Sequence, residues 1–318
     1  MLTTGLIYHP DYLKHDTGKV HPESPSRLSF LMDHLERKKI FSELEQIEPL
    51  NPPLEWVKRI HPSEYIQLIE EFSKHAPAHL DADTVISSET YRVALLAVGG
   101  VLAGVDGVME GKVGNAFCAI RPPGHHAEPN RGMGFCIFNN VALGVRYVQE
   151  KYGLKKVLIV DWDAHHGNGT QKTFYSDPTV YYFSIHQFPF YPGTGKESEK
   201  GEGEGLGYTL NIPMFAGSGD LEYIEVFETI LYPAALQFAP EFIFISAGFD
   251  GHKDDTLTNL QLTDKGFERM TQVIKNLAEK TCQGRLVSVL EGGYNLKALA
   301  CSVEAHLLAL MDKNQAED

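Results

Sequence analysis

Cysteine is scarce in this chain of 318 residues, which contains four: Cys118, Cys136, Cys282 and Cys301. No two of them stand at the short spacing of a metal-binding pair, so the sequence predicts neither a disulfide framework nor a zinc site built from cysteines. Few, unpaired cysteines are typical of a reducing compartment, and we therefore expect the protein in the cytoplasm.

Basic residues are also in deficit, because 28 Lys and Arg oppose 42 Asp and Glu and leave a formal net charge of −14 at pH 7. A protein that binds a phosphate backbone needs a basic stripe, so we expect no nucleic-acid partner. The acidic balance suits a cationic substrate such as a polyamine or a lysine-rich tail, although acidic surfaces more often serve solubility. The sequence shows no apolar run of membrane length and no signal peptide, so we expect neither membrane binding nor secretion.

What the chain does contain is a large apolar fraction, 43% of its residues, which is enough to bury a sizeable core. We interpret residues 1–312 as a single domain and residues 313–318 as a polar C-terminal tail.

Short β-rich apolar runs alternate along the chain with longer segments of helical periodicity. Strands are predicted at residues 5–8, 116–120, 157–160, 180–185, 208–212, 242–245 and 286–290. Helices are predicted at residues 87–110, 139–152, 221–239, 266–280 and 296–311, with a further helix starting near Ser24-Pro25. Because the strands are continuously apolar, this pattern predicts an α/β fold with a central, mostly parallel sheet flanked by helices on both faces. The glycine-rich segment 192–207 is predicted to be a long mobile loop.

Polar motifs stand directly after four of the predicted strands. They are RPPGHH at 121–126, DWDAHHGNG at 161–169, SAGFD at 246–250 and EGGY at 291–294. Ligands of open parallel sheets bind beyond the carboxyl ends of the strands, so we expect these four loops to meet at one edge of the sheet.

Asp163 and His165 are two residues apart, so at an extended strand end both side chains point to the same face. Asp250, at the end of another strand, supplies a third ligand. Two carboxylates and one imidazole with an open position describe a catalytic zinc site, although Fe²⁺ accepts the same ligands. A lone Asp-x-His would be explained equally well as a hydrogen-bonded pair, and it is the convergence with the other strand ends that favours a metal.

His125 and His126 follow Pro-Pro-Gly, a stiff turn that can hold two imidazoles beside a metal-bound water as general base and acid. Tyr294 follows Gly292-Gly293, which leaves the phenol free to donate a hydrogen bond to a developing oxyanion. Taken alone, the histidine pair would be a surface feature and the tyrosine a core residue.

The motifs RPPGHHA, DWDAHHGNGTQ, FYPGTG, SAGFDGHKDD and LEGGYN occur in the order found in histone deacetylases. The chain resembles in particular the class II branch and its bacterial homologues, from HPESPSRL near residue 21 to the last helix. This resemblance implies an arginase/deacetylase-like fold and zinc-dependent hydrolysis of the amide of Nε-acyl-lysine in a peptide or protein. The matching residues are Asp163, His165 and Asp250 for the zinc ligands, His125 and His126 for the catalytic dyad, and Tyr294 for the residue that polarises the acyl carbonyl.

The resemblance also implies supporting residues. Asp161 matches the carboxylate behind His125, whereas Asn168 stands behind His126, where class I relatives carry Asp. A neutral amide stabilises an imidazolium less than a carboxylate does, so we predict a lower pKa for His126 than for His125. The residues that match the narrow acyl-lysine channel are Gly134, Phe135, Tyr191, Leu257 and Gly293. Structural potassium would be bound by Asp161, Asp163, His165, Ser184 and Ile185, and at a second site by Phe174, Asp177, Val180 and Tyr208.

Two other classes of protein could share parts of this pattern. A dimanganese ureohydrolase of the arginase type shares the triplet Asp163-Ala164-His165, but Gly167 stands where its second metal needs Asp, and Gly248 and His252 flank Asp250. A catalytically inactive binding module would be expected to lose a ligand or the tyrosine, and neither is lost.

An acetylpolyamine amidohydrolase uses the same catalytic core on a smaller cationic substrate. Polyamine-selective relatives place a Glu after the SAGFD motif, where this chain has Leu257, so acyl-lysine is favoured. Nearby Asp254 and Asp255 keep the polyamine alternative open. The motifs do not determine the preferred acyl chain length, so a longer-chain deacylase stays an alternative. They do not determine the oligomeric state either, and they are compatible with a homo-oligomer.

Overall fold

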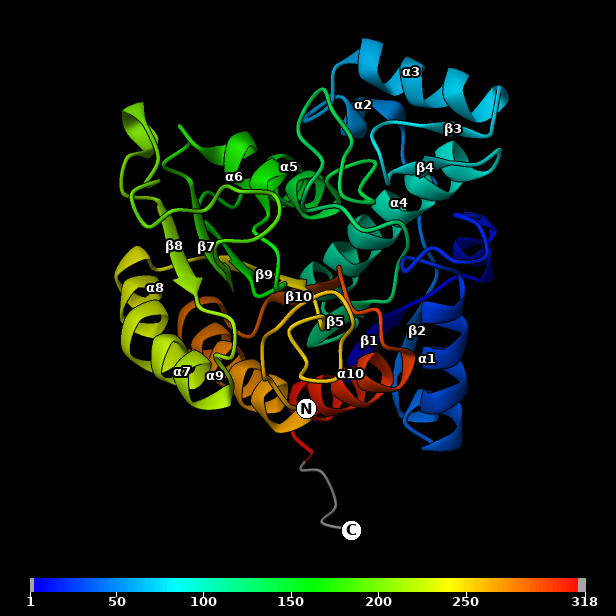
Figure 1. The fold of residues 1–318 in the computed structure, drawn as a ribbon. Coiled ribbons are helices and arrows are strands. Elements are labelled where there is room, and N and C mark those ends of the chain that lie inside the picture. Colours follow the sequence, from blue (N-terminus) through cyan, green and yellow to red (C-terminus); the bar gives the residue numbers. More distant parts are fainter. Residues whose placement is uncertain (1–2, 314–318) are drawn as a thin grey trace.

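A single parallel sheet forms the centre of the protein in the computed structural model, which describes residues 3–313 (Figure 1). The strand order is β2-β1-β5-β10-β9-β6-β7-β8, and every neighbouring pair in this sheet is parallel. The strands are β1 (Thr4–Ile7), β2 (Glu45–Ile47), β5 (Asn115–Cys118), β6 (Val157–Asp161), β7 (Val180–Gln187), β8 (Thr209–Met214), β9 (Phe242–Ala247) and β10 (Leu286–Leu290). The predicted α/β domain with a parallel central sheet is confirmed. The predicted tail, apart from Lys313, lies outside the described residues.

All seven predicted strands are present, and within residues 3–313 the strands that sequence analysis missed are short. The edge strand β2 has three residues, of which two are exposed, so it carries no apolar run. A separate antiparallel pair, β3 (Ala78–His79) and β4 (Val85–Ile86), has two residues in each strand. Strands this short leave no periodicity for sequence analysis to detect.

Helices cover both faces of the sheet (Figure 1). Helices α4 and α5 lie on one face, and α9 and α10, with α1 against α10, cover the other. The helices and helical turns are η1 (Pro10–Lys14), α1 (Ser26–Arg37), η2 (Phe41–Glu43), α2 (Leu54–Val57), α3 (Ser63–Lys74), α4 (Thr90–Met109), α5 (Asn140–Tyr152), α6 (Asn168–Phe174), η3 (Gly203–Gly205), α7 (Asp220–Val226), η4 (Phe227–Leu231), α8 (Tyr232–Phe238), α9 (Asp264–Cys282) and α10 (Leu296–Leu310).

Each predicted helix is found, with local differences. The predicted helix 221–239 is continuous but contains the π turn η4 between α7 and α8. Helix α1 begins at Ser26 without a side-chain cap, so Ser24 does not cap it as its residue type predicts. Helix α5 begins where Asn139 accepts a hydrogen bond from the Ala142 N–H and ends where Gly153 adopts a φ of 73°.

Helix α4 corrects the expectation that no apolar run reaches membrane length. It has 20 residues with a mean hydropathy of 1.7, which is long and apolar enough for a membrane span by length and composition. In the structure 72% of its apolar window is buried, against β1, β5, β10 and α5. A helix that is apolar on every side is also what a buried core position requires, and sequence alone does not separate the two cases.

The segment 192–207 is the loop between β7 and β8, as predicted, but hydrogen bonds tie it to the body of the protein. The Glu199 carboxylate accepts the N–H groups of Gly195 (3.0 Å) and Lys196 (3.1 Å) and the Gln171 side chain (2.6 Å). The Glu202 N–H donates to the Tyr175 carbonyl at 2.9 Å. These contacts argue against the free movement that its glycines predict.

The buried His306 on α10 should make the fold sensitive to acid. Its ring hydrogen-bonds with Thr271 (2.7 Å) and Ser288 (2.9 Å), and burial lowers its pKa from 6.5 to about 3. Between these pH values the unfolded chain binds a proton that the folded protein does not, so the free energy of unfolding falls as the pH drops. From pH 7 to pH 5, this residue should cost about 2 kcal/mol.

Urea titrations of the wild type and His306→Gln at both pH values measure this effect. The variant should lose about 2 kcal/mol less stability between pH 7 and pH 5 than the wild type, because glutamine does not titrate. The same pH dependence in both proteins would contradict the prediction.

Candidate active site and metal centre

The four polar motifs meet at one edge of the sheet because their strands are neighbours. Strands β5, β10, β9 and β6 stand side by side in the sheet and run parallel, so their carboxyl ends share one edge. The expectation that these four loops converge is thereby confirmed, although the order of the strands was not predicted.

Asp163, His165 and Asp250 form a buried cluster beyond β6 and β9. The Nδ1 atom of His165 lies 2.8 Å from Asp250 Oδ2 and 3.2 Å from Asp163 Oδ1. Backbone N–H groups hold three of the four carboxylate oxygens: Asp163 Oδ2 accepts the Gly292 N–H (2.8 Å), Asp163 Oδ1 accepts the His165 N–H (2.8 Å) and Asp250 Oδ1 accepts the Ala164 N–H (2.9 Å). Asp163 Oδ1, Asp250 Oδ2 and His165 Nδ1 face one another.

The charge of this cluster fits a cation. Burial and the neighbouring Asp163 raise the pKa of Asp250 to about 6. Burial alone would lower the pKa of His165, but the two carboxylates raise it to about 10. Two carboxylates buried this close together require a positive charge between them, and a divalent metal ion with oxygen and nitrogen ligands meets that requirement.

Three glycines lie so close to buried carboxylates that a residue with a side chain would not fit in their place. A Cβ at Gly292 would lie 2.5 Å from Asp250 Oδ2, so the close backbone approach predicted for this glycine is present. A Cβ at Gly167 would lie 2.2 Å from Asp161, and one at Gly248 would lie 2.1 Å from Asp163. Neither position has space for the further Asp that a dimetal ureohydrolase needs, which leaves one metal site here.

His125 and His126 lie beside the cluster with different partners. His125 Nδ1 is 3.1 Å from Asp161 Oδ2, and His126 Nδ1 is 2.9 Å from Asn168 Oδ1. Burial would lower the pKa of His125, but the charges of Asp163 and Asp161 raise it to about 10. Burial and the charge of His125 hold the pKa of His126 well below 6.5. This is the order that the sequence predicts for the pair.

A pocket of about 400 Å³ opens above these groups. Three of the predicted groups lie in its lining: His126, His165 and Tyr294. Of the predicted channel residues, the lining includes Gly134, Phe135, Tyr191 and Leu257. Gly293 is not among the lining residues; it is buried, turns the chain with a φ of 121°, and its carbonyl accepts the Arg27 Nε–H at 2.7 Å.

Phe135 adopts a backbone conformation that phenylalanine rarely takes. Its φ of 69° lies in the left-handed region, at a cost of the order of 1–2 kcal/mol. The Thr84 hydroxyl accepts its N–H at 3.1 Å, and its ring meets those of Tyr294 and His21 edge-on at 5.8 Å and 4.7 Å. A strained residue at a pocket wall is typical of a functional site.

Four lining residues were missed by sequence reasoning: His21, Pro22, Asp83 and Phe190. Phe190 stacks on His165 at 5.3 Å between ring centroids, and its place beside Tyr191 was the one local signal for it. His21 hydrogen-bonds with the Asp83 carbonyl at 2.9 Å, which joins two segments that are 62 residues apart. No local pattern indicates such a contact.

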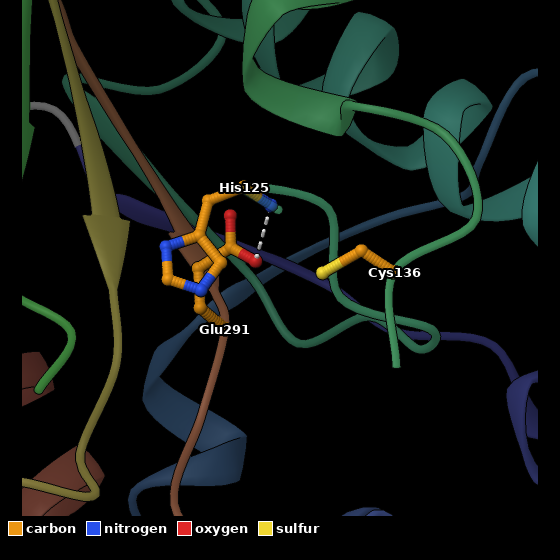
Figure 2. Close-up of side chains that lie close together, drawn as sticks. All are labelled: His125, Cys136 and Glu291. Carbon is orange, nitrogen blue, oxygen red and sulfur yellow. Dashed lines mark hydrogen bonds between the residues drawn. The ribbon is translucent and has the colours of Figure 1, made fainter. Parts of the chain in front are cut away.

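A second buried group lies behind the dyad, where His125, Cys136 and Glu291 point toward one another from three segments (Figure 2). Burial raises the pKa of Glu291 to about 7. Its carboxylate accepts the N–H groups of Gly124 (2.7 Å) and His125 (3.2 Å). The His125 ring hydrogen-bonds with Asp161 instead. Glu291 therefore holds the turn that carries the dyad, and we assign the metal to the other cluster.

Comparisons with known proteins concern the family of the whole chain rather than single residues of the site. A family model described as "Histone deacetylase domain" matches residues 21–310. A protein of Archaeoglobus fulgidus named "Probable deacetylase" is 44% identical over 313 residues, which cover 98% of this chain and 86% of that protein. "Histone deacetylase 14, chloroplastic" of Arabidopsis thaliana is 38% identical over 97% of this chain and 77% of its own length. The solved structure "Crystal Structure of HDA15 HD domain" has a TM-score of 0.94 and 36% identity, and covers 100% of this chain and 90% of that chain.

Proposed function

The chain belongs to the histone deacetylase family and is a deacetylase of the amidohydrolase type, and from this premise we propose that its substrate is Nε-acyl-lysine in peptides or proteins. We propose further that the metal is zinc, held by Asp163, His165 and Asp250. Oxygen and nitrogen ligands from three side chains suit a catalytic zinc site, and Fe²⁺ is the alternative metal.

The observation that supports this proposal most directly is the mixture of groups in the pocket lining. It includes Phe135, Tyr191 and Leu257 together with His126 and Tyr294, and Tyr191 is exposed whereas His126 is buried. A pocket with apolar walls and buried reactive groups suits a substrate with a long aliphatic chain and an amide at its end. The acyl-lysine side chain has this form.

A zinc ion held by Asp163, His165 and Asp250 would supply a Lewis acid for the substrate carbonyl oxygen and would make water a stronger nucleophile at neutral pH. His126, which lines the pocket, takes a proton from the attacking water, whereas the His125 ring is paired with Asp161 outside the lining. The Tyr294 hydroxyl donates a hydrogen bond to the carbonyl oxygen as that atom gains negative charge. The C–N bond then breaks, His126 gives its proton to the leaving amine, and the products are a carboxylate and the unmodified lysine side chain of the peptide.

Asn168→Asp should move the acidic limb of the pH–rate profile upward. An added carboxylate beside His126 favours its imidazolium and therefore raises its pKa. Because His126 accepts a proton only when neutral, activity would then be lost at a higher pH on the acid side. The profile of kcat/KM against pH measures the shift, with Asn168→Ala as the uncharged control. An acidic limb that Asn168→Asp leaves in place would remove support for His126 as the base.

We also propose that the protein binds a structural potassium ion at Asp161, Ser184 and Ile185. The pairing of Asp161 with Ser184 between β6 and β7 supports this proposal. We also propose residues 1–312 as the catalytic domain and a cytoplasmic location, the latter on the scarcity of cysteine.

A turnover panel tests the choice of substrate. Acetyl-, propionyl- and longer acyl-lysine peptides are compared with acetylated polyamines, using metal-depleted and zinc-restored enzyme. We expect higher kcat/KM on the peptides, and we expect Leu257→Glu at the pocket wall to shift preference toward the cationic polyamines. A preference of the wild type for acetylpolyamines would overturn the choice of lysine. Absence of turnover on every amide would overturn the proposed hydrolysis itself.

A further inference from the structure

One buried carboxylate, that of Asp255, joins the two loops that carry the catalytic tyrosine and the pocket rim. The loop after β9 and the turn before α10 lie side by side in Figure 1, in yellow and orange. Asp255 is the last residue of the SAGFDGHKDD motif, and the function proposed above gives it no part in catalysis.

On one side, Asp255 holds the backbone at Tyr294. Its Oδ2 atom accepts the N–H groups of Tyr294 (2.7 Å) and Asn295 (3.0 Å). Asn295 is the N-cap of α10 and accepts the N–H groups of Lys297 and Ala298, both at 3.1 Å. A carboxylate at this position also faces the positive end of the helix dipole, which favours it.

On the other side, Asp255 holds the pocket rim. Its Oδ1 atom accepts the Leu257 N–H at 3.0 Å, and its own N–H donates to the His252 carbonyl at 2.8 Å. Leu257 is part of the pocket lining. The two oxygens of one side chain thus bind the backbone of Tyr294 and that of Leu257.

The side chain of Tyr294 has few other restraints. Among the described residues its hydroxyl has no hydrogen-bond partner, and its ring contacts the Arg27 guanidinium at 5.0 Å and the edge of Phe135. The backbone before it is held at Gly292, whose N–H donates to Asp163, and at Gly293, whose carbonyl accepts from Arg27. Asp255 holds the N–H groups of Tyr294 and of the residue after it, so the direction of the phenol depends on this anchor as well.

We propose that Asp255 is a positioning residue. Its carboxylate orients the Tyr294 hydroxyl toward the reacting carbonyl and also fixes the backbone of Leu257 in the pocket lining. This inference rests on the deacylase function proposed above. Misplacement of a catalytic group by about 1 Å can cost about 100-fold in rate, so loss of this anchor should act mainly on kcat.

The test compares Asp255→Asn with Asp254→Asn. Asparagine has one acceptor oxygen for three N–H donors, so kcat on an acetyl-lysine peptide should fall about 10- to 100-fold. The side chain of Asp254 is 64% exposed and only its backbone oxygen binds Asn295, so its variant should stay within about twofold of the wild type. If Asp255→Asn does not fold, Asp255→Glu displaces the carboxylate and is expected to lower kcat in the same way.

A double variant separates positioning from a general structural role. If Asp255 acts through Tyr294, the loss caused by Asp255→Asn should nearly vanish in the Tyr294→Phe background. Losses that multiply in the double variant would overturn the inference, as would equal kcat values for Asp255→Asn and Asp254→Asn.

Amide hydrogen exchange gives a readout that does not depend on turnover. The amides of Tyr294 and Asn295 should exchange faster in Asp255→Asn than in the wild type and Asp254→Asn, because their acceptor is altered. Unchanged exchange would refute the anchor. A wild type without activity would refute the proposed function, while exchange still reports on Asp255 separately.

Discussion

Replacing Tyr294 with phenylalanine is expected to lower kcat on acyl-lysine peptides by about 10²- to 10³-fold. The loss follows from removing one positioned hydrogen-bond donor to the oxyanion that forms in the reaction. The ring contacts with Arg27 and Phe135 do not involve the hydroxyl, so the protein should stay folded. KM should change little, because the hydrogen bond strengthens mainly as charge develops on the oxygen.

Steady-state kinetics on one acetyl-lysine peptide measure this effect, with Tyr191→Phe as the matched control. Tyr191 also lines the pocket, but it is 40% exposed at the wall, so loss of its hydroxyl should change kcat by only a few-fold. A kcat of Tyr294→Phe close to that of the wild type would exclude the role proposed for the phenol.

Removal of the divalent metal should abolish turnover and lower the melting temperature. Without a cation, the carboxylates of Asp163 and Asp250 face each other across a single imidazole, which is a poor substitute for a divalent ion. An ion that binds only the folded protein stabilises it by about 4 kcal/mol at 1,000 times its Kd, so the melting temperature should rise with added metal.

Chelation followed by reconstitution tests this prediction. Zinc should restore turnover, and Fe²⁺ added without oxygen shows whether the site accepts that ion as well. Asp250→Asn should lose both metal-dependent turnover and the metal-dependent rise in melting temperature, whereas the exposed Asp254→Asn should keep both. Full activity in metal-free protein, or the same metal response in Asp250→Asn, would contradict the assignment of the ligands.

The reactive residues of the site could be predicted from the sequence because they lie in short segments of consecutive residues. Asp163 and His165 share a face through their spacing alone, and the His125-His126 pair is held by the turn before it. Each motif also follows an apolar strand, and the rule that parallel strands end at one edge was sufficient to bring the motifs together.

The strand order could not be obtained in the same way. Strands β10 and β5 are neighbours although about 170 residues separate Val287 from Ala116 in the chain. Short or solvated elements, such as β2 and the β3–β4 pair, were also missed because they have too few residues for a period to appear.

The sequence by itself determined the fold class, the reactive residue types and the expectation of a single metal, because each depends on residue identity and local spacing. Tertiary structure alone decided that His21 and Asp83 join the pocket and that Asp255 anchors Tyr294. It also brought His125 beside two carboxylates and His126 beside an amide in one buried space. The physical reason is that burial, electrostatic pKa shifts and contacts between distant segments arise only when the packed core brings those segments together.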